Sequence, residues 1–122
     1  MAEFIYLNVS PDGERKNDCV TRAITLASGV PYEKVRRKLF HTAKLLECAK
    51  LCWSCYDFLL SDVLKYRKVN CDGMTIGEFA DLHPYGTYLI RIDGHLSVVQ
   101  DGNSIDTFDC RDRYCHIAWE VH

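Results

Sequence analysis

Cys19 is the side chain whose sequence position best suits covalent chemistry. It opens a predicted helix over residues 19–28, which either Asn17 or Asp18 can cap with a short side-chain oxygen. The apolar residues of this stretch recur at helical spacing, at Val20, Ala23, Ile24 and Ala27. A cysteine in the first turn lies near the positive end of the helix dipole, which favours thiolate over thiol. Because a thiolate is a nucleophile, the position raises the question of which residue supplies a base.

His95 has the most informative context of the five histidines. It begins a predicted strand that ends at Asp101-Gly102, a dipeptide typical of a two-residue hairpin turn. If these two residues form the turn, Gln100 pairs with Asn103. Asp106 then lies on the same face as His95, at the diagonal position, with about 7–8 Å between the two backbones. An imidazole and a carboxylate can bridge that separation.

The same register separates Asp106 from the neighbouring aspartates. Counting back from the turn places Ser97 opposite Asp106, whereas Asp109 points to the other face of the sheet. Asp101 has the correct parity but lies six residues from His95, or roughly 20 Å along the strand. The register therefore favours Asp106, and a three-residue loop would make Asp109 the candidate instead.

The elements that must position these residues follow a simple order, with helices first and consecutive strands last. Helices are predicted over residues 19–28, about 31–49, 56–64 and 76–82, and strands over 87–92, 95–100, 103–108 and 114–121. Residues 4–9 also have strand composition, and 65–71 can hold a short strand. This order predicts an α+β fold in one domain, residues 1–122, with N-terminal helices packed on an antiparallel sheet of about four strands.

Four short stretches in this order resemble a known family. They are Asn17-Asp18-Cys19, Gly86-Thr87-Tyr88-Leu89-Ile90, Gly94-His95-Leu96 and Asp101-Gly102-Asn103-Ser104-Ile105-Asp106. The set resembles the papain-like cysteine peptidases, and more narrowly the small papain-like proteins encoded by phages and bacteria. The resemblance runs from residue 17 to about 119 and implies a papain-like fold.

By this resemblance, Cys19 is the nucleophile, His95 the general base and then acid, and Asp106 the orienting group. The backbone N–H of Cys19 would line the oxyanion hole. The family completes that hole with an amide side chain several residues before the cysteine. The nearest amides here are Asn17, which we take as the oxyanion candidate, and Asn8. The glycine-cysteine-tryptophan context of papain is missing.

The remaining cysteines suggest a second kind of site. Cys48, Cys52 and Cys55 have spacing compatible with a metal site, and Cys110 with Cys115-His116 can add ligands for a structural zinc. The same three positions share one helical face, as core residues do, and the short knuckles with turn glycines are absent. We therefore expect no metal and no cofactor. A redox pair at Cys52 and Cys55 lacks the preceding strand of a thioredoxin-like unit.

Composition limits the partners and the compartment. The net charge of −2 predicts no general affinity for nucleic acid or for an anionic membrane. Basic residues gather in 32–50, which we interpret as a solvated helix face, with a docking surface for an acidic partner as the alternative. The seven cysteines are odd in number and no secretory signal pattern is present, so we expect free thiols in the cytoplasm, or the host cytoplasm for a phage protein.

Together these features predict a thiol hydrolase, a cysteine peptidase or amidohydrolase acting on a peptide, isopeptide or other amide through Cys19, His95 and Asp106. The alternative is a catalytically inactive papain-like module that binds a protein, such as a phage-encoded inhibitor of a host defence complex. Either reading implies a protein or peptide as substrate or partner.

Overall fold

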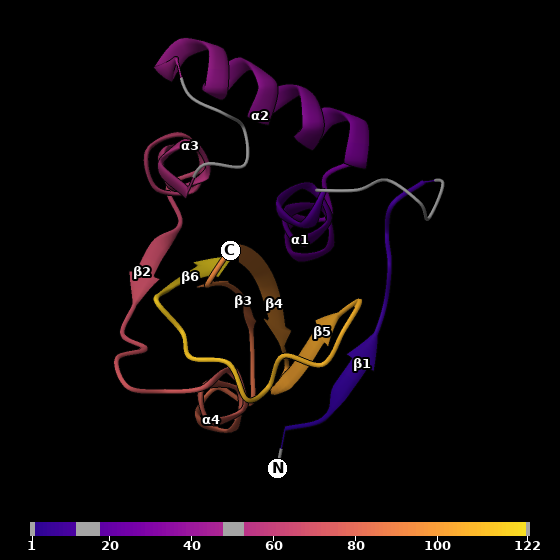
Figure 1. Cartoon of the computed structure of the whole chain (residues 1–122), viewed down its shortest axis with the longest axis vertical. Helices are drawn as coiled ribbons and strands as arrows, with labels where there is room; N and C mark the ends of the chain where they lie inside the picture. Colours follow the sequence, from indigo (N-terminus) through magenta and orange to yellow (C-terminus); the bar gives the residue numbers. More distant parts are fainter. Residues whose placement is uncertain (1, 12–17, 48–52, 122) are drawn as a thin grey trace.

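A computed structural model describes residues 2–11, 18–47 and 53–121 of the chain (Figure 1). The helical elements are α1 (Cys19–Ser28), α2 (Tyr32–Leu46), α3 (Trp53–Asp57), the π-helix η1 (Phe58–Val63) and α4 (Ile76–Leu82). The strands are β1 (Phe4–Tyr6), β2 (Arg67–Val69), β3 (Thr87–Ile92), β4 (His95–Gln100), β5 (Asn103–Asp106) and β6 (Ile117–Val121). The predicted α+β class is confirmed.

The six strands form one open sheet in the order β1-β5-β4-β3-β6-β2. The expectation of about four strands was wrong, because β1 and β2 add one strand at each edge. Each is only three residues long. β1 pairs in parallel with β5, and β2 pairs antiparallel with β6. A parallel partner comes from far away in the chain, so the local alternation of apolar residues does not reveal it.

The sheet is covered on both faces, as Figure 1 shows, with α1, α2 and α3 on one side and α4 on the other. Successive strand residues alternate between the two cores: Leu89 packs with the α1 side, whereas Tyr88 and Ile90 pack with α4. Trp119 is fully buried beneath the N-terminal helices, and its indole N–H donates to Ser61 Oγ at 3.0 Å. The sheet thus has an apolar core on each face, and α1 lies over one of them.

Helix α1 begins at Cys19 and is followed by Gly29 at φ 76°, so both predicted ends are confirmed. Asp18 occupies the cap position, but its side chain accepts no hydrogen bond from the helix N–H groups. Its carboxylate is instead bound to Arg22 and accepts the Tyr32 hydroxyl at 2.8 Å. Asp18 is therefore not the side-chain cap and instead ties the start of α1 to the start of α2, whereas Asn17, the alternative cap, lies outside the described residues.

The second and third predicted helices differ in detail from the structure. The helical spacing of the second predicted helix places Leu46 on its buried side. Leu46 is instead 38% exposed, because α2 ends there and the backbone of Glu47 turns away at φ 55°. The third helix begins at Trp53 and continues as the π-helix η1. The sequence pattern of Thr75 followed three residues later by Glu78 predicts a capping box, and α4 begins with one. No helix in the described part of the chain has the length and apolar character to cross a membrane.

The hairpin between β4 and β5 has the predicted two-residue turn. Gln100 pairs with Asn103, and Asp101 and Gly102 have φ of 50° and 80°. Positive φ at both turn residues matches the right-handed twist of the flanking strands. Strand β5 ends at Asp106 rather than at the expected residue 108. The register that the site depends on is therefore the one expected.

Candidate active site

The β4–β5 hairpin brings His95 and Asp106 into contact. His95 is the first residue of β4 and Asp106 the last of β5, and Nε2 of the ring lies 2.6 Å from Oδ2 of the carboxylate. Both side chains are largely buried, with 11% and 6% of their surfaces exposed. This contact confirms the diagonal pairing expected from the hairpin register. Because Nε2 is used by Asp106, Nδ1 is the ring nitrogen left for another partner.

The carboxylate of Asp106 is surrounded by donors. Oδ2 also accepts the Ser97 hydroxyl at 2.6 Å, and Oδ1 accepts the backbone N–H of Thr107 at 2.7 Å. Burial opposes ionisation, but the hydrogen bond and positive charge of His95, with the Ser97 and Thr107 donors, outweigh it and lower the pKa of Asp106. The residue is therefore a fixed negative charge behind the imidazole.

Cys19 interacts with His95, since α1, which begins at Cys19, packs along β4. Burial raises the pKa of the Cys19 thiol, but the hydrogen bond and charge of His95, a hydrogen bond with the Leu96 backbone and the charge of Arg22 together lower it. The three residues thus form a continuous chain of interactions from Cys19 to Asp106. The helix dipole acts in the same direction on the sulfur.

The same contacts shift the pKa of His95 in the opposite direction, upward. Burial disfavours its charged form, but hydrogen bonds and charges from Asp106 and Cys19 prevail and raise the pKa of His95 to about 9. A cysteine pKa that falls and a histidine pKa that rises favour a thiolate–imidazolium pair at neutral pH. The ring of Phe108 lies beside the imidazole, with 4.9 Å between centroids.

The other candidates from the sequence lie elsewhere. Asp109 binds Arg111 through both carboxylate oxygens, at 2.9 and 2.7 Å, and Asp101 accepts the backbone N–H of Gly86 at 3.1 Å. Asn17, the predicted oxyanion donor, lies outside the described residues. Asn8 Oδ1 accepts the backbone N–H of Ser10. No amide side chain among the described residues is therefore assigned to an oxyanion hole.

Sequence reasoning missed two groups of supporting residues. One is the ion pair of Asp18 and Arg22 with the Tyr32 hydroxyl, which depends on how α2 packs against α1. The other is Ser97, which is 1% exposed and binds Asp106. The register already placed Ser97 opposite Asp106, so a polar residue two positions after His95 was an available signal.

The remaining described cysteines are buried, and four free thiols lie in the cores at Cys55, Cys71, Cys110 and Cys115. Cys55 Sγ donates to the Leu39 carbonyl at 3.7 Å, as a core thiol does. Cys48 and Cys52, the other members of the predicted zinc spacing, lie outside the described residues. Within the described ranges, no group of three or more histidine, cysteine or acidic residues is placed to hold a metal ion.

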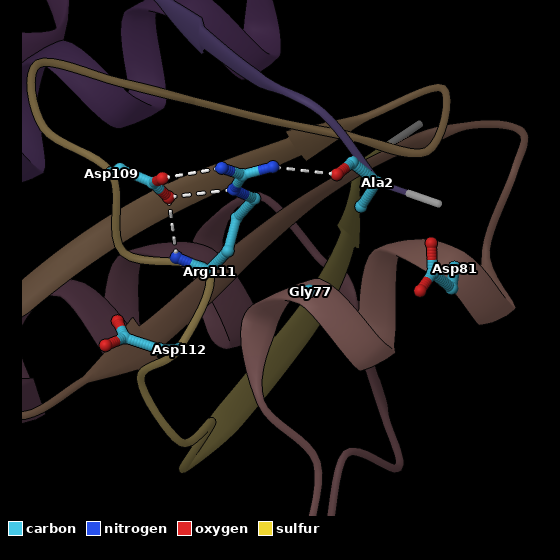
Figure 2. A pocket seen from close by; sticks show the side chains of 6 residues that line it. All are labelled: Ala2, Gly77, Asp81, Asp109, Arg111 and Asp112. Atoms are coloured by element: carbon cyan, nitrogen blue, oxygen red, sulfur yellow. Dashed lines mark hydrogen bonds and ion pairs between the residues drawn. The ribbon is translucent and has the colours of Figure 1, made fainter.

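A cavity of about 460 Å³ lies apart from the triad, between α4 and the loop after β5. Figure 2 shows Arg111 extending from Asp109 to the carbonyl oxygen of Ala2 in this cavity. The guanidinium is already neutralised by Asp109, and Asp81 and Asp112 are exposed to solvent. The described lining of this cavity contains no cysteine, serine or histidine, so Cys19 with His95 stays the candidate site.

Comparison of the chain with protein-family models, with curated proteins and with solved structures finds no match in any of the three. The papain-like resemblance therefore stays a prediction, and the argument for function depends on the geometry around Cys19.

Proposed function

We propose that this protein is a thiol hydrolase that cleaves a peptide, isopeptide or other amide bond. The observation that carries the proposal is the continuous interaction from Cys19 through His95 to the buried carboxylate of Asp106. A nucleophile, a base and an orienting group in this order are the parts that covalent acyl transfer requires. The papain-like resemblance of the same residues supports the same function.

In the resting site, the proton resides on His95 and the negative charge on Cys19. The pKa of His95, raised to about 9, and the lowered pKa of Cys19 both favour this arrangement. Asp106 accepts the Nε2–H and fixes the ring, which leaves Nδ1 as the nitrogen for the interaction with Cys19. The nucleophile is therefore formed before the substrate arrives.

In the acylation step, the Cys19 sulfur attacks the carbonyl carbon, and a C–S bond forms while the carbonyl π electrons move to oxygen. His95 then gives its proton to the leaving nitrogen, the C–N bond breaks and the amine departs. The N–H groups at the start of α1 suit the oxyanion, because the Asp18 side chain accepts none of their hydrogen bonds. The product of this step is a thioester.

In the deacylation step, neutral His95 takes a proton from water as the water oxygen attacks the thioester carbon. The C–S bond breaks, the carboxylic acid leaves and the thiolate–imidazolium pair is restored. Asp106 stays ionised in both steps and stabilises the imidazolium each time that it forms.

The test combines thiol labelling with acylation. We expect iodoacetamide to modify Cys19 faster than an exposed free cysteine at about pH 6, and His95→Ala to remove the advantage. An activated p-nitrophenyl ester should release a burst of one nitrophenolate per chain, which Cys19→Ser abolishes. Ordinary Cys19 reactivity that His95→Ala leaves unchanged, with no burst, would refute the proposal.

A second candidate function, protein binding without catalysis, is favoured by the outer face of α2. Phe40 is 63% exposed there, and Arg36, Arg37 and His41 line a cavity of about 300 Å³ with it. Basic side chains around an exposed aromatic ring suit an acidic protein surface. A partner captured equally by the wild type and by Cys19→Ala, and lost with Phe40→Ala, would favour binding as the function.

A further inference from the structure

Ser97 is a buried polar residue that contacts Asp106 and has no role in the catalytic steps proposed above. It lies on β4 two residues after His95, on the same face, and is 1% exposed. Its hydroxyl lies 2.6 Å from Asp106 Oδ2, the same oxygen that binds His95 Nε2 at 2.6 Å. A single carboxylate oxygen is thus held from two sides, by the imidazole and by the serine.

The direction of the serine hydrogen bond follows from the donors present. An ionised carboxylate only accepts hydrogen bonds, so the hydroxyl hydrogen of Ser97 must point to Asp106. The Ser97 oxygen then faces Cys110 Sγ, 3.4 Å away, with a lone pair. Burial raises the pKa of the Cys110 thiol, so Cys110 keeps its hydrogen and can donate it to Ser97. The Cys110 thiol also lies 3.9 Å from Asp106 Oδ2, so its hydrogen can be donated either to Ser97 or directly to the carboxylate.

The carboxylate has little freedom to rotate in this environment. Oδ1 is bound by the Thr107 N–H at 2.7 Å, while Oδ2 receives His95 and Ser97. Removing the serine hydroxyl leaves, among the described residues, His95 and the weaker, more distant Cys110 thiol at 3.9 Å as donors to Oδ2. The buried carboxylate would then be solvated less well, its ionised form would be less favourable, and its support for the imidazolium would weaken.

We propose that Ser97 is a positioning residue of the active site, which holds Asp106 Oδ2 ionised and aimed at His95. The inference rests on the proposed triad of Cys19, His95 and Asp106. Among the described residues, the charged and titratable groups around this centre are the three triad residues, Arg22 with its ion-pair partner Asp18, and Cys110 with Asp109 in the loop after β5. Ser97 acts on the reaction through Asp106 and does not touch the reacting atoms.

The test is an NMR titration of the His95 ring in the wild type and in Ser97→Ala. We expect Ser97→Ala to lower the His95 pKa by about half a unit to one unit, because part of a charge-assisted hydrogen bond is lost. Alkylation of Cys19 by iodoacetamide should slow about 3- to 10-fold at pH ~6 and change less than about 2-fold at pH ~10, where the thiol is ionised in both proteins. A purely structural defect would slow it at every pH.

The matched control is Ser104→Ala. Ser104 is a fully buried serine on β5 whose hydroxyl interacts with the Cys110 thiol rather than with Asp106 or His95. Ser104→Ala should leave the His95 pKa unchanged. Ser97→Thr, which keeps the hydroxyl, should give the wild-type His95 pKa. If Ser97→Ala does not fold, the nearly isosteric Ser97→Cys, a weaker donor, should lower the His95 pKa in its place.

An unchanged His95 titration in the folded Ser97 variants, or an equal shift in Ser104→Ala, would overturn the role of Ser97. That failure is separate from failure of the hydrolase proposal, which would appear as absence of the acylation burst in the wild type. The ring titration requires no substrate and reads the Asp106 contact directly.

Discussion

Replacing Asp106 by asparagine tests how the charge behind His95 sets the reactivity of Cys19. The Asp106 side chain is 6% exposed and its Oδ2 lies 2.6 Å from Nε2 of the imidazole. Asparagine keeps the shape of the side chain and an oxygen acceptor but removes the negative charge. The substitution therefore separates the orienting role of the residue from its electrostatic role.

The magnitude follows from the kind of hydrogen bond that is lost. A bond to a charged partner contributes about 1.5–3 kcal/mol, whereas a neutral one contributes about 1 kcal/mol. One pKa unit corresponds to about 1.4 kcal/mol, so the change should lower the His95 pKa by roughly one unit. His95, with a pKa raised to about 9 in the wild type, would then lose its proton at a lower pH.

The pKa of Cys19 should shift in the opposite direction to that of His95. The Cys19 thiolate is stabilised by the positive charge of the His95 imidazolium. When that imidazolium is less stable, the pKa of the thiol rises. The acidic limb of the alkylation profile should therefore move to higher pH in Asp106→Asn. At pH ~6 the rate should fall about 10-fold, while near pH 10 the two proteins should react alike.

The assay is iodoacetamide alkylation from about pH 4 to pH 10, followed by intact mass and peptide mapping so that Cys19 is read separately from the other thiols. The control is Asp109→Asn, a nearby aspartate that binds Arg111 and not His95. The reasoning is refuted if the acidic limb of Asp106→Asn coincides with that of the wild type, or if Asp109→Asn moves it equally.

Two further predictions concern the elements that hold the site. Gly102→Ala should lower the free energy of unfolding by about 1–3 kcal/mol in urea melts, since Gly102 has φ 80° and an added Cβ would lie 3.3 Å from Pro84 Cα. Gly94→Ala, at φ 64° with open space around it, should cost about 1 kcal/mol, and equal losses would count against the Pro84 contact. Asp18→Ala should cost about 1–3 kcal/mol, and combining it with Tyr32→Phe should cost less than the sum, because the two share a hydrogen bond. Additive losses would argue against that bond.

Local sequence chemistry predicted the part of the site that lies within one hairpin. Asp101-Gly102 has a strong preference for a two-residue turn, and the turn determines which residues of β4 and β5 face each other. Selecting Asp106 over Asp109 required only this register and the alternation of side chains along a strand. The same logic extends to Ser97, whose contact with Asp106 lies in the same hairpin.

Short-range signals also located the ends of α1 and the capping box of α4, because caps and turn glycines act within a few residues. They did not predict the destination of the Asp18 side chain. The backbone N–H groups of the first helical turn compete for this carboxylate with Arg22 and with Tyr32 on α2. The packing of α2 on α1 decides between them.

The sequence by itself therefore determined the α+β class, the helix that begins at Cys19 and the pairing of His95 with Asp106, since each depends on local propensity or on one turn. The tertiary structure alone decided that Cys19 reaches His95, because α1 and β4 are brought together by packing between distant segments. It also decided the two edge strands and the buried contact of Cys110 with Ser97. These arrangements arise from burial of apolar surface among distant elements, which no short stretch of sequence specifies.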